Sequence, residues 1–410
     1  MYFIYNILIL IVAFSLKIVA FLNKKINLFV EGRSLTFSKL TAAISKEDMV
    51  IWMHCASLGE FEQGRPIIEK LKVQYPTYKL VITFFSPSGY EIRKNYEVAD
   101  VVCYLPLDSK KNAKQFLTVV HPELAIFVKY EFWPNLLKEL QNKKIKTILV
   151  SGIFRKDQVF FKWYGGWMRK SLTAFSHFFV QDKNSKELLE SIHFQNITLS
   201  GDTRFDRVFE ITKQNNTLDF IAEFKSNSYT LVAGSTWKED EDLLVEYINN
   251  KASENEKFII APHNIKAKEI EELKNSIAKK TVLFSEKENK NLKDFQVFII
   301  DTVGILTKIY NYANIAYVGG GYTKSGIHNV LEPATFGVPI VIGPNYQKFN
   351  EAIELVENKA CFVVDNSQKL SVLLDEFYQD KQKRELAGSN ALNYVINKTG
   401  ATSKILNFIK

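Results

Sequence analysis

Three stretches of the sequence place reactive side chains directly after a strand-like run. In the first, His54–Glu60, an apolar run ends in a tight turn, and Glu60 falls in the first turn of the helix that follows. A carboxylate in that position ordinarily stabilises the positive end of a helix. The alternative is a general base that faces a cleft, with its pKa lowered by the helix terminus and raised by desolvation. The sequence alone leaves this choice open.

The second stretch, Lys129–Asn135, carries a charged pair between a strand and a helix. Pro134 suits the first turn of that helix, and the two aromatic residues before it are expected to pack beneath the loop. Lys129 and Glu131 form either an ion pair at the strand end or part of a site.

The third stretch, Val318–Pro333, begins with three glycines after a strand and is expected to enter a helix near 326–329. Glycines let a ligand approach the backbone, and free N–H groups at a helix start suit a phosphate. Glu332 would lie about one turn into the helix, where a carboxylate can accept hydrogen bonds from two ribose hydroxyls. The spacing matches neither GxGxxG nor GxxxxGK[ST], and a flexible loop is the alternative.

Three smaller loops are expected at matching strand ends and could line one wall of the same pocket: Gly234–Trp237, Ala261–Asn264 and Asp301–Ile305. A lone histidine such as His263 is more often a structural hydrogen-bonding residue than a catalyst. The sequence has no HExxH, CxxC or EF-hand spacing, so we predict no protein-bound catalytic metal and no cofactor. Cys55, Cys103 and Cys361 lie in apolar runs and are expected to be buried free thiols of a reducing compartment.

The elements that position these loops are indicated by apolar, β-rich runs that alternate with charged stretches of helical spacing. The runs are 49–57, 79–86, 101–105, 124–128, 146–150, 177–181 and 197–199, then 230–233, 257–261, 282–284, 297–300, 315–318, 339–342 and 361–364. Such alternation forms parallel sheets with helices on both faces and ligands at the carboxyl ends of the strands. We predict an α/β fold with two Rossmann-like domains facing a cleft, over 24–208 and 229–395, joined near 206–228 and followed by a C-terminal helix over 396–410.

The N-terminal segment Tyr2–Leu22 is apolar apart from one asparagine, one serine and Lys17. About 20 residues suffice to span a bilayer. Two lysines follow at positions 24 and 25, so the positive-inside tendency keeps the rest of the chain on the cytoplasmic side. We predict a membrane anchor over 1–23, with spanning and interfacial placement both open. A buried helix packed on the first domain is the alternative.

Charge and aromatic patterning point to anionic partners. The 53 Lys and Arg residues exceed the 45 Asp and Glu residues by 8. Phe160–Lys170 interleaves aromatic residues with cations, which is typical of a membrane interface, with ordinary core packing as the alternative. A nucleic-acid binder is disfavoured because the cations are spread along the chain without an RRM, zinc-finger or basic-helix signature.

Together these motifs resemble the bacterial Kdo transferases, the 3-deoxy-D-manno-octulosonic-acid transferases of lipopolysaccharide synthesis. The combination of ASLGE, EFWPN and HNVLEP is far more specific than any one of them. The matching pieces, in family order over nearly the whole chain, are the N-terminal run, WMHCASLGE (Trp52–Glu60), YEFWPN (Tyr130–Asn135), GDTRFD (Gly201–Asp206), VAGST (Val232–Thr236), APH (Ala261–His263), DTVG (Asp301–Gly304) and GGGYTKSGIHNVLEP (Gly319–Pro333).

The resemblance implies an inverting, metal-independent GT-B glycosyltransferase at the inner membrane that moves Kdo from CMP-Kdo to a lipid A precursor, lipid IVA. The domain 24–208 would hold the acceptor and 229–395 the donor. Glu60 would be the general base, and Arg204 would stabilise developing negative charge. Glu131 is carried over without a fixed role, because Lys129 replaces the first acid of the family's Glu-x-Glu. The nucleotide contacts carry over onto Ser235, Thr236, Pro262, His263, Val303, Gly304, Ile305, Asn329, Val330, Leu331 and Glu332.

Two other classes of protein remain open from the sequence. A related two-domain enzyme acting on a UDP-sugar, either a transferase or an epimerase, predicts that UDP protects the protein against thermal unfolding where CMP does not. A membrane-bound nucleotide-sensing or scaffold protein predicts that Glu60→Ala leaves function unchanged.

Overall fold

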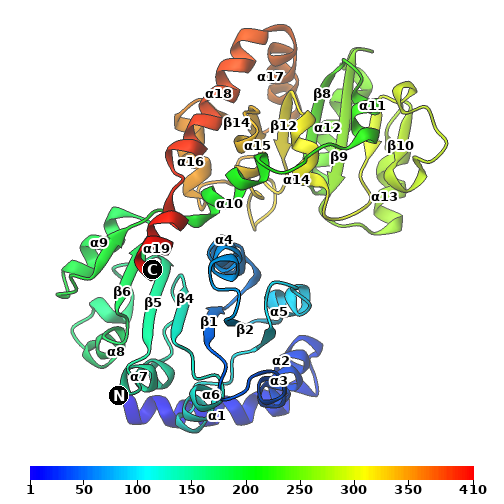
Figure 1. Cartoon of the computed structure of the whole chain (residues 1–410). Coiled ribbons are helices and arrows are strands. Elements are labelled where there is room, and N and C mark those ends of the chain that lie inside the picture. The colour runs from blue at the N-terminus through cyan, green and yellow to red at the C-terminus, as the bar shows by residue number, and fades with distance from the viewer. The chain divides into compact units, whose positions relative to one another are not determined.

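The computed structural model describes all 410 residues and divides into two compact units. Unit 1 comprises Met1–Arg207 and Thr399–Lys410, and unit 2 comprises Val208–Lys398. Each unit contains one seven-stranded parallel sheet packed against helices (Figure 1). The predicted α/β fold with two Rossmann-like domains is therefore confirmed.

The elements of unit 1 alternate between strand and helix after three N-terminal helices. They are α1 (Tyr2–Ala20), α2 (Lys24–Ser34), α3 (Thr36–Ala43), β1 (Val50–Cys55), α4 (Leu58–Gln74), β2 (Lys79–Phe84), α5 (Pro87–Arg93), β3 (Val101–Tyr104), α6 (Lys110–Val119), β4 (Leu124–Val128), α7 (Pro134–Asn142), β5 (Lys146–Gly152), η1 (Val159–Phe161), α8 (Gly166–Leu172), β6 (His177–Val180), α9 (Lys183–Glu190), β7 (Ile197–Leu199) and, at the C-terminus, α19 (Ala401–Ile409).

Helix α10 (Thr203–Thr212) contains the boundary between the units, and the same alternation continues through unit 2. Its elements are α11 (Asp219–Lys225), β8 (Tyr229–Thr236), α12 (Lys238–Asn250), β9 (Glu256–Pro262), α13 (Ala267–Ser276), β10 (Thr281–Leu283), η2 (Phe284–Glu286), η3 (Leu292–Asp294), β11 (Val297–Ile299), α14 (Leu306–Ile309), η4 (Tyr310–Tyr312), β12 (Ile315–Val318), α15 (Leu331–Thr335), β13 (Ile340–Ile342), α16 (Asn350–Glu357), β14 (Cys361–Val363), α17 (Ser367–Gln379) and α18 (Lys381–Asn397).

All fourteen predicted runs form strands, because a strand buried on both faces reads as a nearly continuous apolar run. In β1, all six residues are buried. Trp52 packs into the core on one face of the first sheet, and Met53 packs into the core on the other. The three cysteines are buried and free, as predicted, and burial raises the pKa of the Cys103 thiol to about 12.

Strand order sets the position of each candidate loop. The first sheet has the order β3-β2-β1-β4-β5-β6-β7, so the chain runs outward from β1 to β3 and then returns to the other side of β1 to form β4. The second sheet has the order β10-β11-β9-β8-β12-β13-β14 and reverses in the same way between β8 and β12. Ligands of open parallel sheets bind at such switch points, beside the carboxyl ends of the strands.

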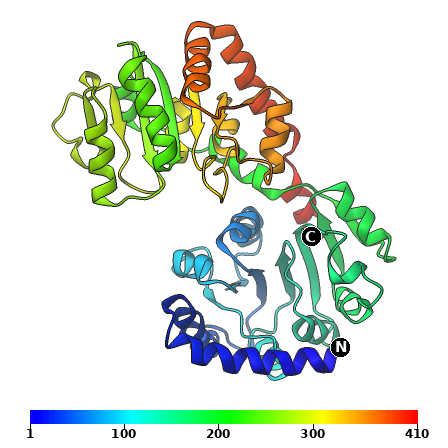
Figure 2. The same cartoon turned by 180° about the vertical axis from the view of Figure 1, so that it is seen from behind.

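Helix α1 is the one helix long and apolar enough to cross a membrane, judged by length and composition. One side of it is tied to unit 1. The Tyr2 hydroxyl donates to Asn135 Oδ1 (2.5 Å), the Tyr5 hydroxyl donates to Asp108 Oδ2 (2.7 Å), and the Asn135 amide donates to Asn6 Oδ1 (3.1 Å). Figures 1 and 2 show the helix extended along the outside of unit 1, beside α6 and α7.

The other side of α1 is exposed and apolar, with Phe3 76% and Phe14 67% accessible. The stretch Phe160–Lys170 likewise contains both packed and exposed aromatic residues. Phe160 is buried in the core, whereas Trp163 is 91% exposed. Trp167 lies against Tyr5 of α1, with ring centroids 5.9 Å apart.

The C-terminal helix α19 belongs to unit 1, and the side chain of Asp206 holds its first residues in place. Its carboxylate accepts hydrogen bonds from the backbone N–H groups of Gly400 (2.6 Å) and Thr402 (2.7 Å) and from the Thr402 hydroxyl (2.8 Å). These are the unpaired donors of a helix N-terminus, so the last acid of the GDTRFD motif acts structurally as a cap.

Candidate active site

Glu60 lies at the start of α4, directly after β1. Ser57 is the N-cap residue, and the Glu60 carboxylate accepts from its backbone N–H through Oε2 (2.8 Å), which forms one half of a capping box. The first-turn stabilising role considered from the sequence is thus present. It occupies one carboxylate oxygen and holds the group in place. Glu60 is only 5% exposed, and both of its hydrogen bonds to Ser57 are made through Oε2, which leaves Oε1 for a ligand.

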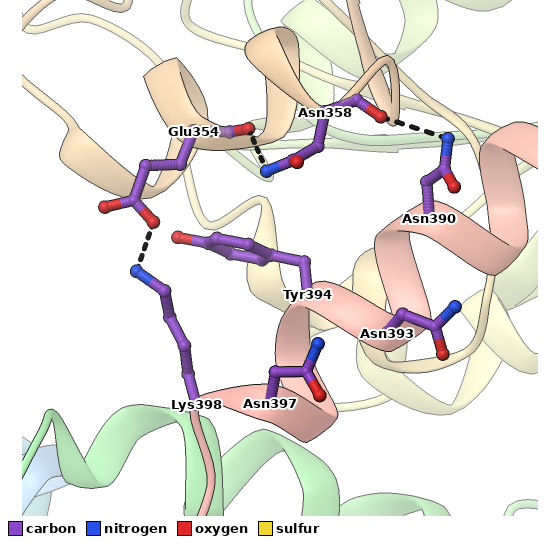
Figure 3. A pocket seen from close by; sticks show the side chains of 7 residues that line it. All are labelled: Glu354, Asn358, Asn390, Asn393, Tyr394, Asn397 and Lys398. Atoms are coloured by element: carbon purple, nitrogen blue, oxygen red, sulfur yellow. Dashed lines mark hydrogen bonds and ion pairs between the residues drawn. The ribbon is translucent and has the colours of Figure 1, made fainter.

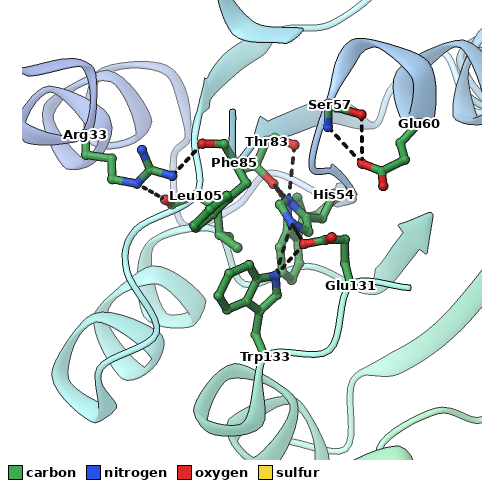
Figure 4. A network of polar contacts seen from close by, with 10 residues as sticks. Arg33, His54, Ser57, Glu60, Thr83, Phe85, Leu105, Glu131 and Trp133 are labelled. Atoms are coloured by element: carbon green, nitrogen blue, oxygen red, sulfur yellow. Dashed lines mark hydrogen bonds and ion pairs between the residues drawn. The ribbon is translucent and has the colours of Figure 1, made fainter. Parts of the chain in front are cut away.

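Glu131 follows β4 and points at the end of β1 (Figure 4). Its Oε2 accepts a hydrogen bond from Trp133 Nε1 (3.0 Å) and lies 3.4 Å from His54 Nε2. The Lys129–Glu131 ion pair considered from the sequence does not form; Lys129 adopts a left-handed backbone conformation (φ +72°). A non-glycine residue in this region stores strain and is typical of functional loops.

The two carboxylates meet because β1 and β4 are neighbours at the switch point of the first sheet. Burial raises the pKa of Glu60 above the ordinary carboxyl value, and the negative charge of Glu131 raises it further. The Ser57 N–H and the positive charge of Lys129 oppose that shift. A buried carboxylate with a raised pKa is suited to accept a proton near neutral pH.

Cations surround this pair of acids. Burial lowers the pKa of Lys129, and the positive charges of Arg204 and Arg155 add to the lowering, whereas Glu60 opposes it. Arg204 Nε donates to Asp202 Oδ2 (2.7 Å), and Asp202 is buried. The three predicted catalytic residues, Glu60, Glu131 and Arg204, therefore lie in one electrostatic cluster in unit 1. The cluster also contains Lys129, together with His54 and Arg155, which were not among the predicted site residues.

In unit 2, the loops after β8, β9 and β12 are neighbours at the second switch point. The Gly319 backbone passes so close to β8 that a Cβ there would stand 2.4 Å from the Ser235 carbonyl oxygen. The backbone N–H of His263 donates to the Thr236 carbonyl (2.8 Å). The Thr236 hydroxyl is buried and donates to Glu241, so this side chain is committed to the protein.

An aromatic stack stands at the same edge. His263 lies parallel to Trp237 (ring centroids 4.8 Å apart) and to His328 (4.4 Å). Trp237 Nε1 donates to His328 Nε2 (3.0 Å), and burial lowers the pKa of His328 to about 4, so this ring is neutral at physiological pH. Trp237 and His328 lie within motifs that the sequence analysis quoted, but it assigned them no contact.

The helix expected near 326–329 begins later, at Leu331, and has only five residues. The expectation was wrong because Gly326 is in a left-handed conformation (φ +84°) and the chain after it stays irregular. Glu332 is therefore the second helical residue. Its Oε2 accepts from the Thr307 hydroxyl (2.8 Å), and its Oε1 accepts from the Asn329 amide (3.0 Å).

The remaining predicted donor residues lie at the ends of elements of unit 2. Ile305 is the N-cap of α14, which carries Thr307, and Val303 is largely exposed beside Gly304. Val330 and Leu331 are buried, so they can meet a ligand only through their backbone. Pro262 ends β9. No three His, Cys, Asp or Glu side chains converge in a way that would hold a metal ion.

A separate hollow of about 330 Å³ lies between α16 and α18 of unit 2 (Figure 3). Its polar groups largely serve the protein: the Asn358 amide donates to the Glu354 carbonyl, the Asn390 amide donates to the Asn358 carbonyl, and Lys398 pairs with the Glu354 carboxylate. None of the predicted site residues lines it.

The fold is shared with solved two-domain enzymes that bind nucleotide sugars. A UDP-GlcNAc 2-epimerase from Neisseria meningitidis superposes with a TM-score of 0.60 at 16% identity, over 88% of this chain and 99% of that one. A likeness at this identity defines the architecture, the GT-B arrangement of two Rossmann-like domains.

Sequence comparison goes further. Residues 32–207 match the family described as 3-deoxy-D-manno-octulosonic-acid transferase (kdotransferase). A 3-deoxy-D-manno-octulosonic acid transferase from Aquifex aeolicus is 28% identical over 81% of this chain and 87% of its own length. A bifunctional glycosyltransferase/methyltransferase from Fusobacterium nucleatum is 26% identical over 89% of this chain, which spans 58% of that relative's length. Residues 32–207 thus resemble the Kdo transferase family, and the similarity to Kdo transferases from other bacteria extends over most of the chain.

Proposed function

We propose that this protein transfers Kdo from CMP-Kdo to a lipid A precursor in lipopolysaccharide synthesis. The observation that carries the proposal is the pairing of Glu60 and Glu131 at the switch point of unit 1, within the residues that match the Kdo transferase family. Glu60 would remove a proton from the attacking sugar hydroxyl. The oxygen would then bond to the anomeric carbon of Kdo as the bond to the CMP phosphate breaks, which inverts the configuration.

Positive charge near these acids supports an anionic donor. Kdo carries a carboxylate and CMP a phosphate, and both would be balanced by Arg204 and Lys129. Fixed cations in a partly buried site stabilise charge that develops in the transition state without reorganisation. This role gives a reason for Lys129 at the position where the family has an acid, because its partly buried ammonium adds to the field that favours an anion.

In unit 2, Glu332 would accept the two ribose hydroxyls of CMP, with Asn329 and Thr307 holding the carboxylate in place. The Ser235, Thr236 and Pro262 backbone, the His263 ring, the loop Val303–Ile305 and the backbone of residues 329–331 would complete the donor site. The glycine loop after β12 leaves room for the phosphate.

The exposed face of α1 would bind the cytoplasmic surface of the inner membrane, where the lipid acceptor resides. We favour an interfacial helix over a spanning one. Tyr2, Tyr5 and Asn6 are bonded to unit 1 near one end of α1, and Ala20 is buried at the other, so the helix is docked along its whole length. A helix that is held to the protein along one side can insert only its exposed apolar side into the membrane interface.

The proposed activity is tested by incubating the purified protein with CMP-Kdo and lipid IVA and following the product by mass spectrometry. We expect one or more Kdo additions, with Glu60→Gln lowering kcat at least about a hundredfold. Because the pKa of Glu60 is raised in the folded state, its ionisation costs folding free energy as the pH rises above the ordinary carboxyl value. Glu60→Gln should therefore be at least as stable as the parent at pH 7. Near-normal turnover in this variant would remove Glu60 from the mechanism.

The donor site is tested by calorimetry. Glu332→Ala should weaken CMP binding about 5- to 150-fold, the range for a lost hydrogen bond to a charged acceptor. Glu357→Ala removes an exposed carboxylate from α16 of the same unit and serves as the control. Equal CMP affinity in both variants would place the nucleotide elsewhere. Binding of UDP in preference to CMP would instead favour the UDP-sugar enzyme.

The proposed membrane binding is tested by substitutions that place negative charges on the exposed face of α1. Leu10→Glu with Phe14→Glu should reduce sedimentation with anionic vesicles about tenfold or more, since two charges replace apolar groups at the lipid boundary. Activity on detergent-dispersed acceptor should persist, because both side chains point away from unit 1. Val73→Glu on α4, which replaces another exposed apolar residue, is the control. If the double variant still sediments like the parent protein, the anchor is not this face.

A further inference from the structure

His54 is the last but one residue of β1, and its side chain is fully buried beside the proposed active site. The proposed mechanism gives it no role. Both ring nitrogens nevertheless lie near polar groups: Nδ1 is 2.9 Å from the Thr83 hydroxyl and 3.2 Å from the Thr83 carbonyl oxygen, and Nε2 is 3.4 Å from Glu131 Oε2. A buried histidine with partners on both sides has its tautomer fixed by whichever partner must donate.

On the sheet side of His54, the hydrogen-bond direction of the Thr83 hydroxyl is set by a further neighbour, Trp52. Trp52 Nε1 can only donate, and it donates to the Thr83 hydroxyl oxygen (2.9 Å). Thr83 is fully buried on the neighbouring strand β2, in register with His54. With one N–H already pointing at its oxygen, the hydroxyl is free to direct its own proton to His54 Nδ1.

On the other side of the His54 ring, Nε2 faces the carboxylate of Glu131. If Nδ1 accepts, the ring proton of neutral His54 sits on Nε2 and points at Glu131 Oε2, the same oxygen that accepts from Trp133 Nε1. In the opposite tautomer, His54 Nε2 would accept from Trp133 Nε1 (3.3 Å), and the Thr83 hydroxyl would accept from both Trp52 and His54. The Trp133 N–H would then be shared between His54 and Glu131, and the Nε2 lone pair would lie against the carboxylate. The doubly protonated form would bury a positive charge next to that carboxylate. The Nε2–H form gives Glu131 Oε2 two N–H donors and keeps the ring neutral, and a hydrogen bond to a charged acceptor is stronger than one between neutral groups.

We propose that Trp52, Thr83 and His54 form a directional hydrogen-bond chain that fixes His54 in the neutral Nε2–H form and makes it the positioning residue of Glu131 (Figure 4). The chain joins the core of the first sheet to the loop after β4. It fixes one carboxylate oxygen by two N–H groups and leaves Oε1 of Glu131 for the substrate. This inference rests on the proposed function only in assigning Glu131 to the site.

The tautomer can be measured directly. In protein labelled with 15N on its six histidines, the parent should show one ring protonated on Nε2 and unprotonated on Nδ1, and Glu131→Gln should not invert that state. His54→Gln assigns the signals by their loss. A His54 ring that is protonated on Nδ1, or on both nitrogens, would overturn the inference whether or not the protein transfers Kdo.

Two substitutions of Thr83 separate this role from packing. Thr83→Val keeps the shape and removes the hydroxyl, so Nδ1 is left with a carbonyl that can only accept, and the ring should switch to the Nδ1–H form. We expect kcat to fall about tenfold or more with little change in KM for the donor, the size expected for one lost hydrogen bond to a charged group. Thr83→Ser restores the hydroxyl and should restore the Nε2–H form and most of the turnover.

The outcomes are distinct from those that test the proposed function. A parent enzyme that transfers Kdo while Thr83→Val retains both its tautomer and its kcat contradicts the chain. Equal losses in Thr83→Val and Thr83→Ser also contradict it, because they indicate packing. A confirmed tautomer in a protein without transferase activity would overturn the role of His54 in Kdo transfer and leave only its structural part.

Discussion

Repulsion between two carboxylates that are largely shielded from bulk water, Glu60 at 5% and the Glu131 side chain at 12% exposure, is the constraint around which unit 1 is arranged. Glu60 and Glu131 are placed together by topology, since β1 and β4 adjoin only because the chain reverses there. Each acid is then held by donors on one oxygen: Glu60 by the backbone of Ser57, and Glu131 by Trp133 and His54. The positive charge of Lys129 opposes part of the remaining negative charge at Glu60, and Arg204, which is paired with Asp202, lies near Lys129. The raised pKa of Glu60 follows from this arrangement and suits the base that we propose.

Unit 2 repeats the topology with different chemistry. Its switch point carries glycines, a histidine–tryptophan stack and one carboxylate, Glu332, whose two oxygens accept from Thr307 and Asn329. The Gly319 backbone lies so close to β8 that any side chain at this position would clash with it. In our proposal, the same fold therefore provides the base at one sheet and the nucleotide-binding groups at the other.

The sequence predicted the elements of this arrangement better than their contacts. The strands could be predicted because burial on both faces leaves a continuous apolar run. Glu60, Glu131 and Glu332 could be singled out because they lie in the stretches that follow such runs. The partnership of His54 with Glu131 spans 77 residues and depends on strand order, which no local pattern encodes. The late start of α15 was missed because Gly326 continues the loop, and the docking of α1 depends on Asp108 and Asn135, which the N-terminal run does not reveal.

The central claim, that the charge of Glu131 sets the basicity of Glu60, is tested most directly by the pH dependence of kcat/KM in the parent and in Glu131→Gln. Loss of activity at low pH should report protonation of Glu60, whose pKa is raised by burial and by Glu131. Removing that negative charge should lower the pKa of Glu60 and move the acid limb of the residual activity to lower pH. An acid limb at the same pH in both proteins, or at higher pH in the variant, would contradict the account.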